Sequence, residues 1–169
     1  MATHYYKEIT TGPLDGNAIV ETFLAEEANI PLWSPVALVA AGSGEYIARA
    51  GLTASADDPT VVGVVVGPLR DAENLYASTA AGQAIQVCTH GKCKVRVDGT
   101  DAIAVGDALV SYAGDTYAKL MDADDGTSWA TVTTQIGKVN AGFAKALYAA
   151  TVDGDIIPCF VRGAGGTIT

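Results

Sequence analysis

The chain has 169 residues, including 29 Ala and 19 Gly, and only 17% of them are charged, against roughly 25% in globular proteins. The net charge of −9 argues against nucleic acid and anionic membranes as partners, because both need clustered Lys and Arg. The ten Lys and Arg residues look scattered along the sequence, and so many small side chains leave few groups for catalysis.

Residues 1–17 are predicted to form an extended N-terminal arm, and residues 18–169 a single β domain. The arm is polar and carries the turn dipeptides Gly12-Pro13 and Asp15-Gly16. It lacks the apolar segment of a secretory signal, and no apolar run reaches the ~18 residues of a membrane-spanning helix. Together with three cysteines, this predicts synthesis in a reducing cytosol.

Short β-type runs alternate with turn residues over the rest of the chain. We expect strands near residues 18–25, 35–40, 46–50, 61–66, 84–97, 108–112, 116–120, 136–139, 143–149 and 156–161. Many short strands at regular spacing predict an all-β fold, a compact sandwich or barrel of short antiparallel strands. Residues 70–76 and 142–150 are the best helix candidates, and for the second we prefer a strand because a hairpin turn, Asp153-Gly154, follows it.

Residues 35–67 and 106–142 resemble each other. Ala37-Leu38-Val39 corresponds to Ala108-Leu109-Val110, and the run that ends at Arg49 corresponds to the run that ends at Lys119. This similarity predicts a structural repeat of two hairpin units. Chance is the alternative, because hairpins recur in any β protein.

The segment from Cys88 to Cys93 carries the side chains that most suggest a chemical role. Cys88, His90 and Cys93 are weak candidates for three zinc ligands, since no second Cys pair completes a site. A turn at His90-Gly91 would instead place the two thiols opposite each other for a disulfide. The favoured interpretation is one long strand bent at Gly91, with both thiols as small core residues. We expect no catalytic residues, no bound metal and no cofactor.

Four aromatic residues are candidates for contacts with a partner. A Trp next to a loop often anchors an interface, although it can equally cap the core. The candidates are Tyr5 and Tyr6 in the arm, and Trp33 and Trp129 beside loops.

Several runs resemble the pattern of tailed-phage capsid decoration proteins, which are also called head-stabilising or cement proteins. The resemblance covers roughly residues 15–163, and its motifs mark strands and turns rather than catalytic groups. The chain departs from the family pattern at Cys88 and Cys93 and at the loop 31–35. The matching runs are Ala81–Val87, Gly91, Val95–Val97 and Ile103–Leu109, with further matches at Val62–Val65, Ile136-Gly137, Ala146–Ala150 and Ile156–Val161.

This resemblance implies a β-tulip-like fold and a structural role. The expected protein is a homotrimer on the outer surface of the virion capsid, made in the host cytoplasm. There it binds the major capsid protein, and its arm reaches over the capsid or a neighbouring subunit. Two alternatives stay open. One is a receptor- or glycan-binding spike or head-fibre module that uses the four aromatic residues, and the other is a small all-β enzyme that depends on His90 and Asp107.

Overall fold

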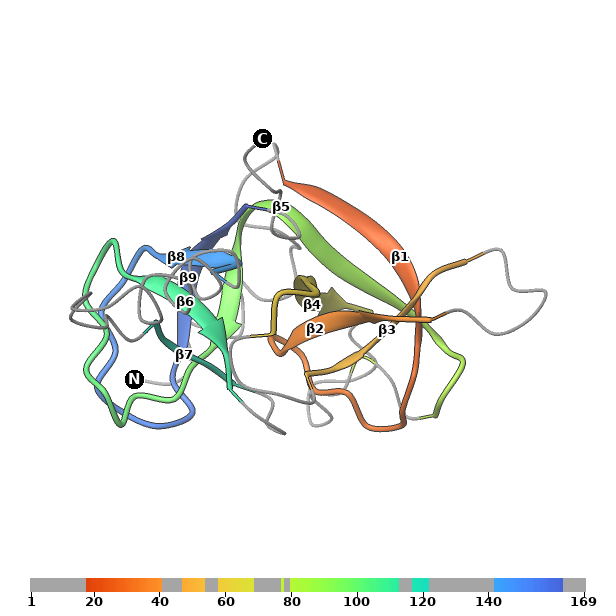
Figure 1. The fold of residues 1–169 in the computed structure, drawn as a ribbon, viewed down its shortest axis with the longest axis horizontal. Helices are drawn as coiled ribbons and strands as arrows, with labels where there is room; N and C mark the ends of the chain where they lie inside the picture. The colour runs from red at the N-terminus through yellow and green to blue at the C-terminus, as the bar shows by residue number, and fades with distance from the viewer. Residues whose placement is uncertain are drawn as a thin grey trace, which may run out of the picture.

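The computed structural model describes residues 18–40, 47–53, 58–68, 77, 80–112, 117–121 and 142–162. Within these residues the chain forms nine strands and no helix (Figure 1), which confirms the all-β prediction. The arm, the helix candidate at residues 70–76 and the strand expected near 136–139 lie outside the described residues. The strands are β1 (Ile19–Ala25), β2 (Pro35–Val39), β3 (Arg49–Leu52), β4 (Val61–Gly67), β5 (Ala84–Arg96), β6 (Ala108–Ser111), β7 (Ala118–Leu120), β8 (Ala144–Ala146) and β9 (Ile156–Val161).

The first five strands close into a barrel. They pair in the order β1-β3-β2-β4-β5, and β1 also pairs with β5, so the ring has no open edge. All these pairs are antiparallel except β1–β3, where Leu24 and Ala25 run parallel to Arg49 and Ala50. The sequence predicted a barrel or sandwich of antiparallel strands, and β1–β3 is the exception to it within the barrel. A parallel pair needs a long crossover connection, and the chain between β1 and β3, which includes β2, supplies it.

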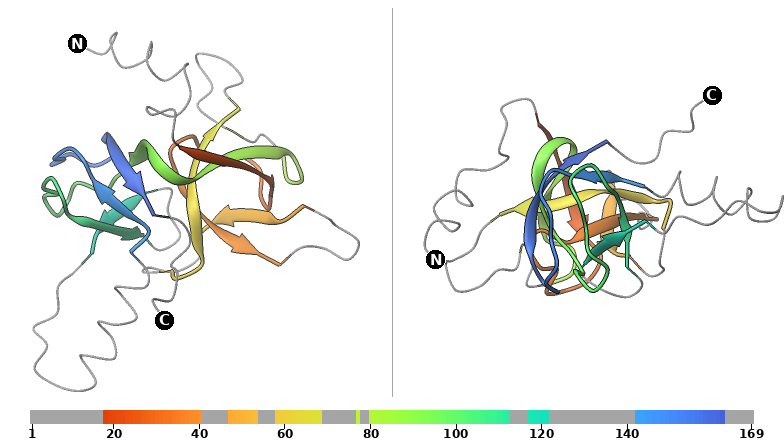
Figure 2. Two further views of the ribbon diagram at one scale, coloured as in Figure 1. Left: turned by 90° about the horizontal axis from the view of Figure 1, so that it is seen from above. Right: turned by 90° about the vertical axis from the view of Figure 1, so that its left-hand side faces the viewer.

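A second group of strands continues from β5 in the order β5-β9-β8-β6-β7. A parallel bridge between Val97, just after β5, and Ala118 in β7 brings the last strand of this group back to the first. We call this group the second ring. β5 passes from the barrel into the second ring, and the two lie side by side along the molecule (Figure 2).

β5 is a single strand of 13 residues with a bend at Gly91. Its first half pairs with β1 and β4, and its second half, from Gly91 onward, pairs with β9. Gly91 has a φ of 100°, and a Cβ at this position would lie 2.7 Å from the Cα of Ala18. Both the backbone angle and this close approach require glycine. The structure thus has the long strand bent at Gly91 that the sequence favoured, and no hairpin turn at His90-Gly91.

The two hairpins that resemble each other in sequence also share a register. Val39 lies opposite Arg49 in β2–β3, and Val110 lies opposite Lys119 in β6–β7. These are the residues that the sequence comparison aligned. The full repeat of residues 35–67 and 106–142 extends into parts of the chain that the structure does not describe, and it stays a prediction.

The strand expected at 143–149 is shorter in the structure. β8 ends at Ala146, and the chain then turns so that Ala150 pairs with Ile103. Alanine-rich composition did not make this segment helical, because Ala144 and Ala146 are buried between β6 and β9.

Replacement of Gly91 tests the bend in β5. Gly106 is a matched control, because it has a similar φ of 95° but open space around its hypothetical Cβ. Gly106→Ala should lower the free energy of unfolding by about 1–2 kcal/mol, the cost of a left-handed backbone. Gly91→Ala should cost about 2 kcal/mol more, because its Cβ would also collide with Ala18. Urea denaturation measures both, and equal losses would contradict the close approach.

Candidate interaction surface

The second half of β5 sorts its side chains between two faces. Cys93 and Val95 belong to the buried core of the second ring, whereas Lys92, Lys94 and Arg96 alternate with them on the opposite side of the strand. Of these three, Lys92 is exposed. The outward row continues across the sheet. Lys92 lies opposite Phe160 in β9, and Phe160 lies opposite Lys145 in β8.

Basic residues gather on this outer face of the second ring. Lys119 lies on the same face. It is opposite Val110 in β6, and Lys145 is opposite Ala108. Residues two apart along a strand share a face. Among Lys and Arg in the described residues, Arg49 alone belongs to the barrel, where it pairs with Glu26 at 3.0 Å. The view of the basic residues as scattered is therefore wrong for this part of the chain. The others, on this face or at its edge, are Lys92, Lys94, Arg96, Lys119, Lys145 and Arg162.

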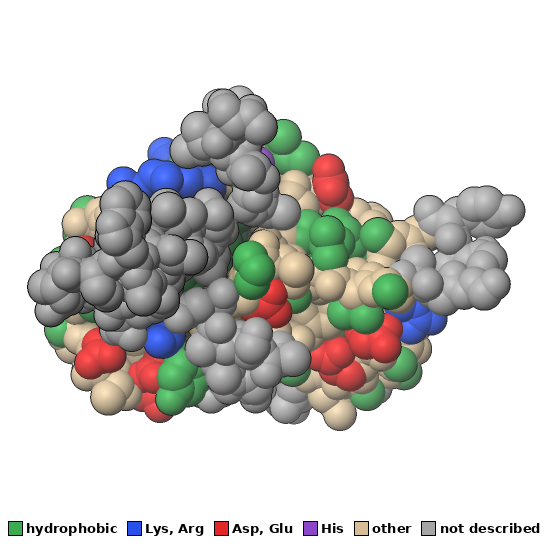
Figure 3. Space-filling view, viewed as in Figure 1, with side chains coloured by type: hydrophobic (Ala, Val, Ile, Leu, Met, Phe, Trp, Pro, Cys, Tyr) green, Lys and Arg blue, Asp and Glu red, His purple; other side chains and the backbone are tan. Residues whose placement is uncertain are grey.

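One end of this face is exposed, and it forms what we call the basic patch: His90, Lys92, Lys145, Phe160 and Arg162. The two lysines flank the Phe160 ring across the strands, and Arg162 follows it along the chain. The His90 ring meets the Phe160 ring edge-on, with centroids 5.4 Å apart and planes at 82°. Figure 3 shows Lys and Arg side chains together at the upper left, above β8 and β9. The patch offers several positive charges around one aromatic side chain.

The other end of the face is covered. Lys94 is buried, and Arg96 is half-buried with its guanidinium 5.6 Å from the centre of the Tyr117 ring. The backbone N–H of Arg96 donates to the carbonyl of Trp33. This end of β5 therefore packs against the barrel loop and β7 rather than facing a partner.

The cysteines belong to the core. Cys88, Cys93 and Cys159 are all buried, and the Sγ atoms of Cys93 and Cys159 lie 3.7 Å apart on facing positions of β5 and β9. A hydrogen bond from Cys93 lowers the pKa of Cys88, whereas contact with the two neighbouring thiols and burial raise the pKa of Cys93 well above its usual value. His90 is exposed, and its backbone carbonyl accepts a hydrogen bond of 3.5 Å from the Cys88 thiol. Within the described ranges, no three metal-ligating side chains gather.

Trp33 lies in the core, with 2% of its surface exposed. Its backbone N–H donates to Val65 in β4 and its carbonyl accepts from Arg96, so it joins the barrel to the second ring. It has almost no surface to offer a partner, and of the two roles open to it the structure favours the core. Tyr5, Tyr6 and Trp129, the other aromatic candidates, lie outside the described residues.

Several solved structures are similar to this chain, and one of them is a phage protein. The solved N base of the head fibre protein gp8.5 of bacteriophage phi29 is similar over 88% of this chain and 98% of its own, with a TM-score of 0.46 and 17% identity. No family model matches the chain, and no curated protein matches its sequence. Among the described residues, no helix is long and apolar enough to cross a bilayer.

The basic patch was not foreseen from the sequence. The alternation of Lys92, Lys94 and Arg96 along one strand was the available signal, since alternate residues share a face. Lys145 and Arg162 lie at least 49 residues further along the chain, and only the pairing of β5 with β9 and β8 brings them alongside.

Burial of the thiols predicts their reactivity. In the native protein the three cysteines should react very slowly with a thiol reagent, because the reagent must reach a thiolate that the fold shields. A Val105→Cys variant is the control, since Val105 is 67% exposed and a thiol there should react at once. Absorbance with dithiobis-nitrobenzoate follows both, and unfolding should release all three native thiols. Rapid labelling of the native wild-type chain would contradict the burial.

Proposed function

We propose that the chain is a structural virion protein that binds the outer surface of a tailed-phage capsid as a homotrimer and stabilises the head. The observation that carries the proposal is the one-sided charge of the second ring. A chain with a net charge of −9 keeps most of its described basic residues on one face. Such a surface orients a protein on an acidic partner, because an approach through the chain's acidic surfaces brings like charges together.

The residues that carry the resemblance to decoration proteins have clear structural roles. Gly82 precedes β5 with a φ of 78°, and Gly106 precedes β6 with a φ of 95°. Gly91 bends β5 between the two rings. Glycine is the residue that takes these angles without strain. The glycines of the pattern therefore lie at the points that shape this fold. This supports the resemblance to decoration proteins, from which the capsid is inferred as the partner.

The residues on which the enzyme alternative depends have structural partners. The His90 ring packs against Phe160, and a carboxylate oxygen of Asp107 accepts a hydrogen bond of 2.7 Å from the backbone N–H of Ala104. These contacts favour a structural role for His90 and Asp107 over a catalytic one. The glycan-binding alternative loses one of its four aromatic candidates, because Trp33 is buried.

Capsids that lack this protein provide the direct test. Purified chain added to shells of the major capsid protein from the same phage should cosediment with them to saturation. The bound shells should also withstand a higher temperature before they break, because bridging contacts oppose the separation of capsomers. A glycan array serves as the parallel assay for the alternative. Glycan binding without cosedimentation would overturn the capsid proposal in favour of a receptor-binding module.

A further inference from the structure

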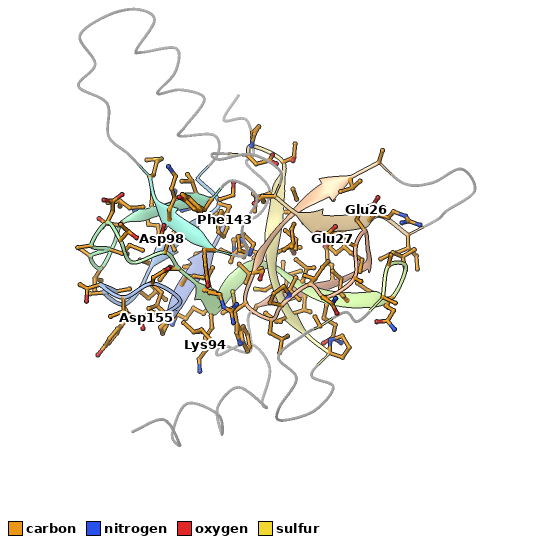
Figure 4. All side chains as sticks on the ribbon, turned by 90° about the horizontal axis from the view of Figure 1, so that it is seen from below. Glu26, Glu27, Lys94, Asp98, Phe143 and Asp155 are labelled. Carbon is orange, nitrogen blue, oxygen red and sulfur yellow. The ribbon has the colours of Figure 1, made fainter. Side chains whose placement is uncertain are left out.

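Two of the buried cysteines face each other across paired strands. Cys93 in β5 lies directly opposite Cys159 in β9, and their Sγ atoms are 3.7 Å apart. Both belong to the hydrophobic core that also contains Phe143, which Figure 4 shows among the strands of the second ring. Neither cysteine is part of the basic patch, so the capsid proposal leaves this pair of thiols without a role.

The register of β5 and β9 places these two thiols within the range of a disulfide. Facing residues of an antiparallel pair have Cα atoms about 4.5–5.5 Å apart, and disulfides bridge Cα atoms about 4.4–6.8 Å apart. The distance between the Sγ atoms has to fall from 3.7 Å to about 2.05 Å. Rotation of the two side chains can supply this change, because the spacing of the backbones is already suitable.

Cys88, the third buried cysteine, is less well placed for such a bond. It lies before the bend, where β5 pairs with β4 in the barrel, and its thiol donates a hydrogen bond of 3.5 Å to the carbonyl of His90. Cys88 also accepts a hydrogen bond from Cys93, so a bond between these two is the competing product. Because they belong to one strand, no cross-strand register holds their Cα atoms at the spacing of a disulfide.

We propose that Cys93 and Cys159 form a disulfide site, at which a low-molecular-weight disulfide such as oxidised glutathione joins β5 to β9. The thiolate of one cysteine attacks the glutathione disulfide, which forms a mixed disulfide and releases one glutathione. The other cysteine then attacks the protein sulfur of the mixed disulfide, the bond between the two cysteines forms, and the second glutathione leaves. The two thiols lose two electrons, which the oxidant gains, and their protons end on the two released glutathiones.

This bond closes a loop that contains most of the second ring. Cys93 and Cys159 are 66 residues apart, and β6, β7 and β8 lie between them. A cross-link stabilises a protein mainly by restricting its unfolded chain, and the effect grows with the length of the loop. Thiols stay reduced in the cytosol, whereas disulfides persist in oxidising surroundings such as the surface of a virion. Only this timing rests on the proposed function; the bond itself rests on the pairing of β5 with β9.

Oxidative refolding tests the assignment. The reduced chain is unfolded in urea and refolded in a buffer of reduced and oxidised glutathione, because buried thiols react only when the fold opens. The remaining free thiols are then alkylated in urea before digestion with trypsin. Trypsin cuts after Lys92, Lys94 and Lys145, so the three cysteines lie on three separate peptides. Mass spectrometry should find the short peptide Cys93-Lys94 joined to the peptide that carries Cys159.

The same bond should raise the thermal stability. The wild-type chain refolded with glutathione should unfold about 10 °C above the chain refolded with dithiothreitol, as a loop of this length predicts for a domain of this size. Cys88→Ala is the matched control, since it removes a buried thiol but keeps the facing pair, and it should retain the shift. Cys159→Ala should lose it. Scanning calorimetry compares the two forms of each chain, so any destabilisation by the substitution itself cancels.

Three results would overturn the proposal. The first is a wild-type chain in which all three thiols are alkylated after oxidative refolding. The second is a bond between Cys88 and Cys93 as the main product, and the third is a Cys159→Ala chain that keeps the thermal shift. None of these measurements uses a capsid, so a failure here is distinct from a failure of capsid binding.

Discussion

The structure depends on the passage of β5 through both rings. One strand closes the barrel with β1 and β4, then bends at Gly91 and begins the second ring with β9. The bend is possible only where Ala18 can approach a residue without a side chain. Because the two cores share this strand, their relative position is set by covalent geometry and not by a flexible linker.

β5 also determines where the candidate interaction surface of the second ring lies. In a closed ring each strand has one inner and one outer side, and alternate residues of β5 supply Cys93 to the core and Lys92 to the surface. The interiors of small barrels are filled by side chains, and the many alanines suit this narrow space: Ala118, Ala144 and Ala146 are buried within the second ring. Binding of a partner therefore involves the outer faces of the rings and the loops at their ends.

Local sequence signals were enough to predict most strands and the bend. β9 and the start of β5 have the predicted bounds, because apolar runs and turn glycines are local features. Pairing is not local, so the parallel β1–β3 pair was missed and the lysines of β5, β7 and β8 looked scattered. Burial of Trp33 depends on hydrogen bonds to β4 and β5, which no pattern near residue 33 indicates.

The charge distribution explains how an acidic chain can recognise one partner in one orientation. At a net charge of −9, two copies or a copy and another acidic surface repel each other at long range. Among the described surfaces, the basic patch is the one that would attract approaching carboxylates within a screening length. Repulsion elsewhere thus contributes to specificity as much as the contacts themselves. Lys145 and Arg162 flank the Phe160 ring, so the same few residues set the orientation and supply the apolar contact.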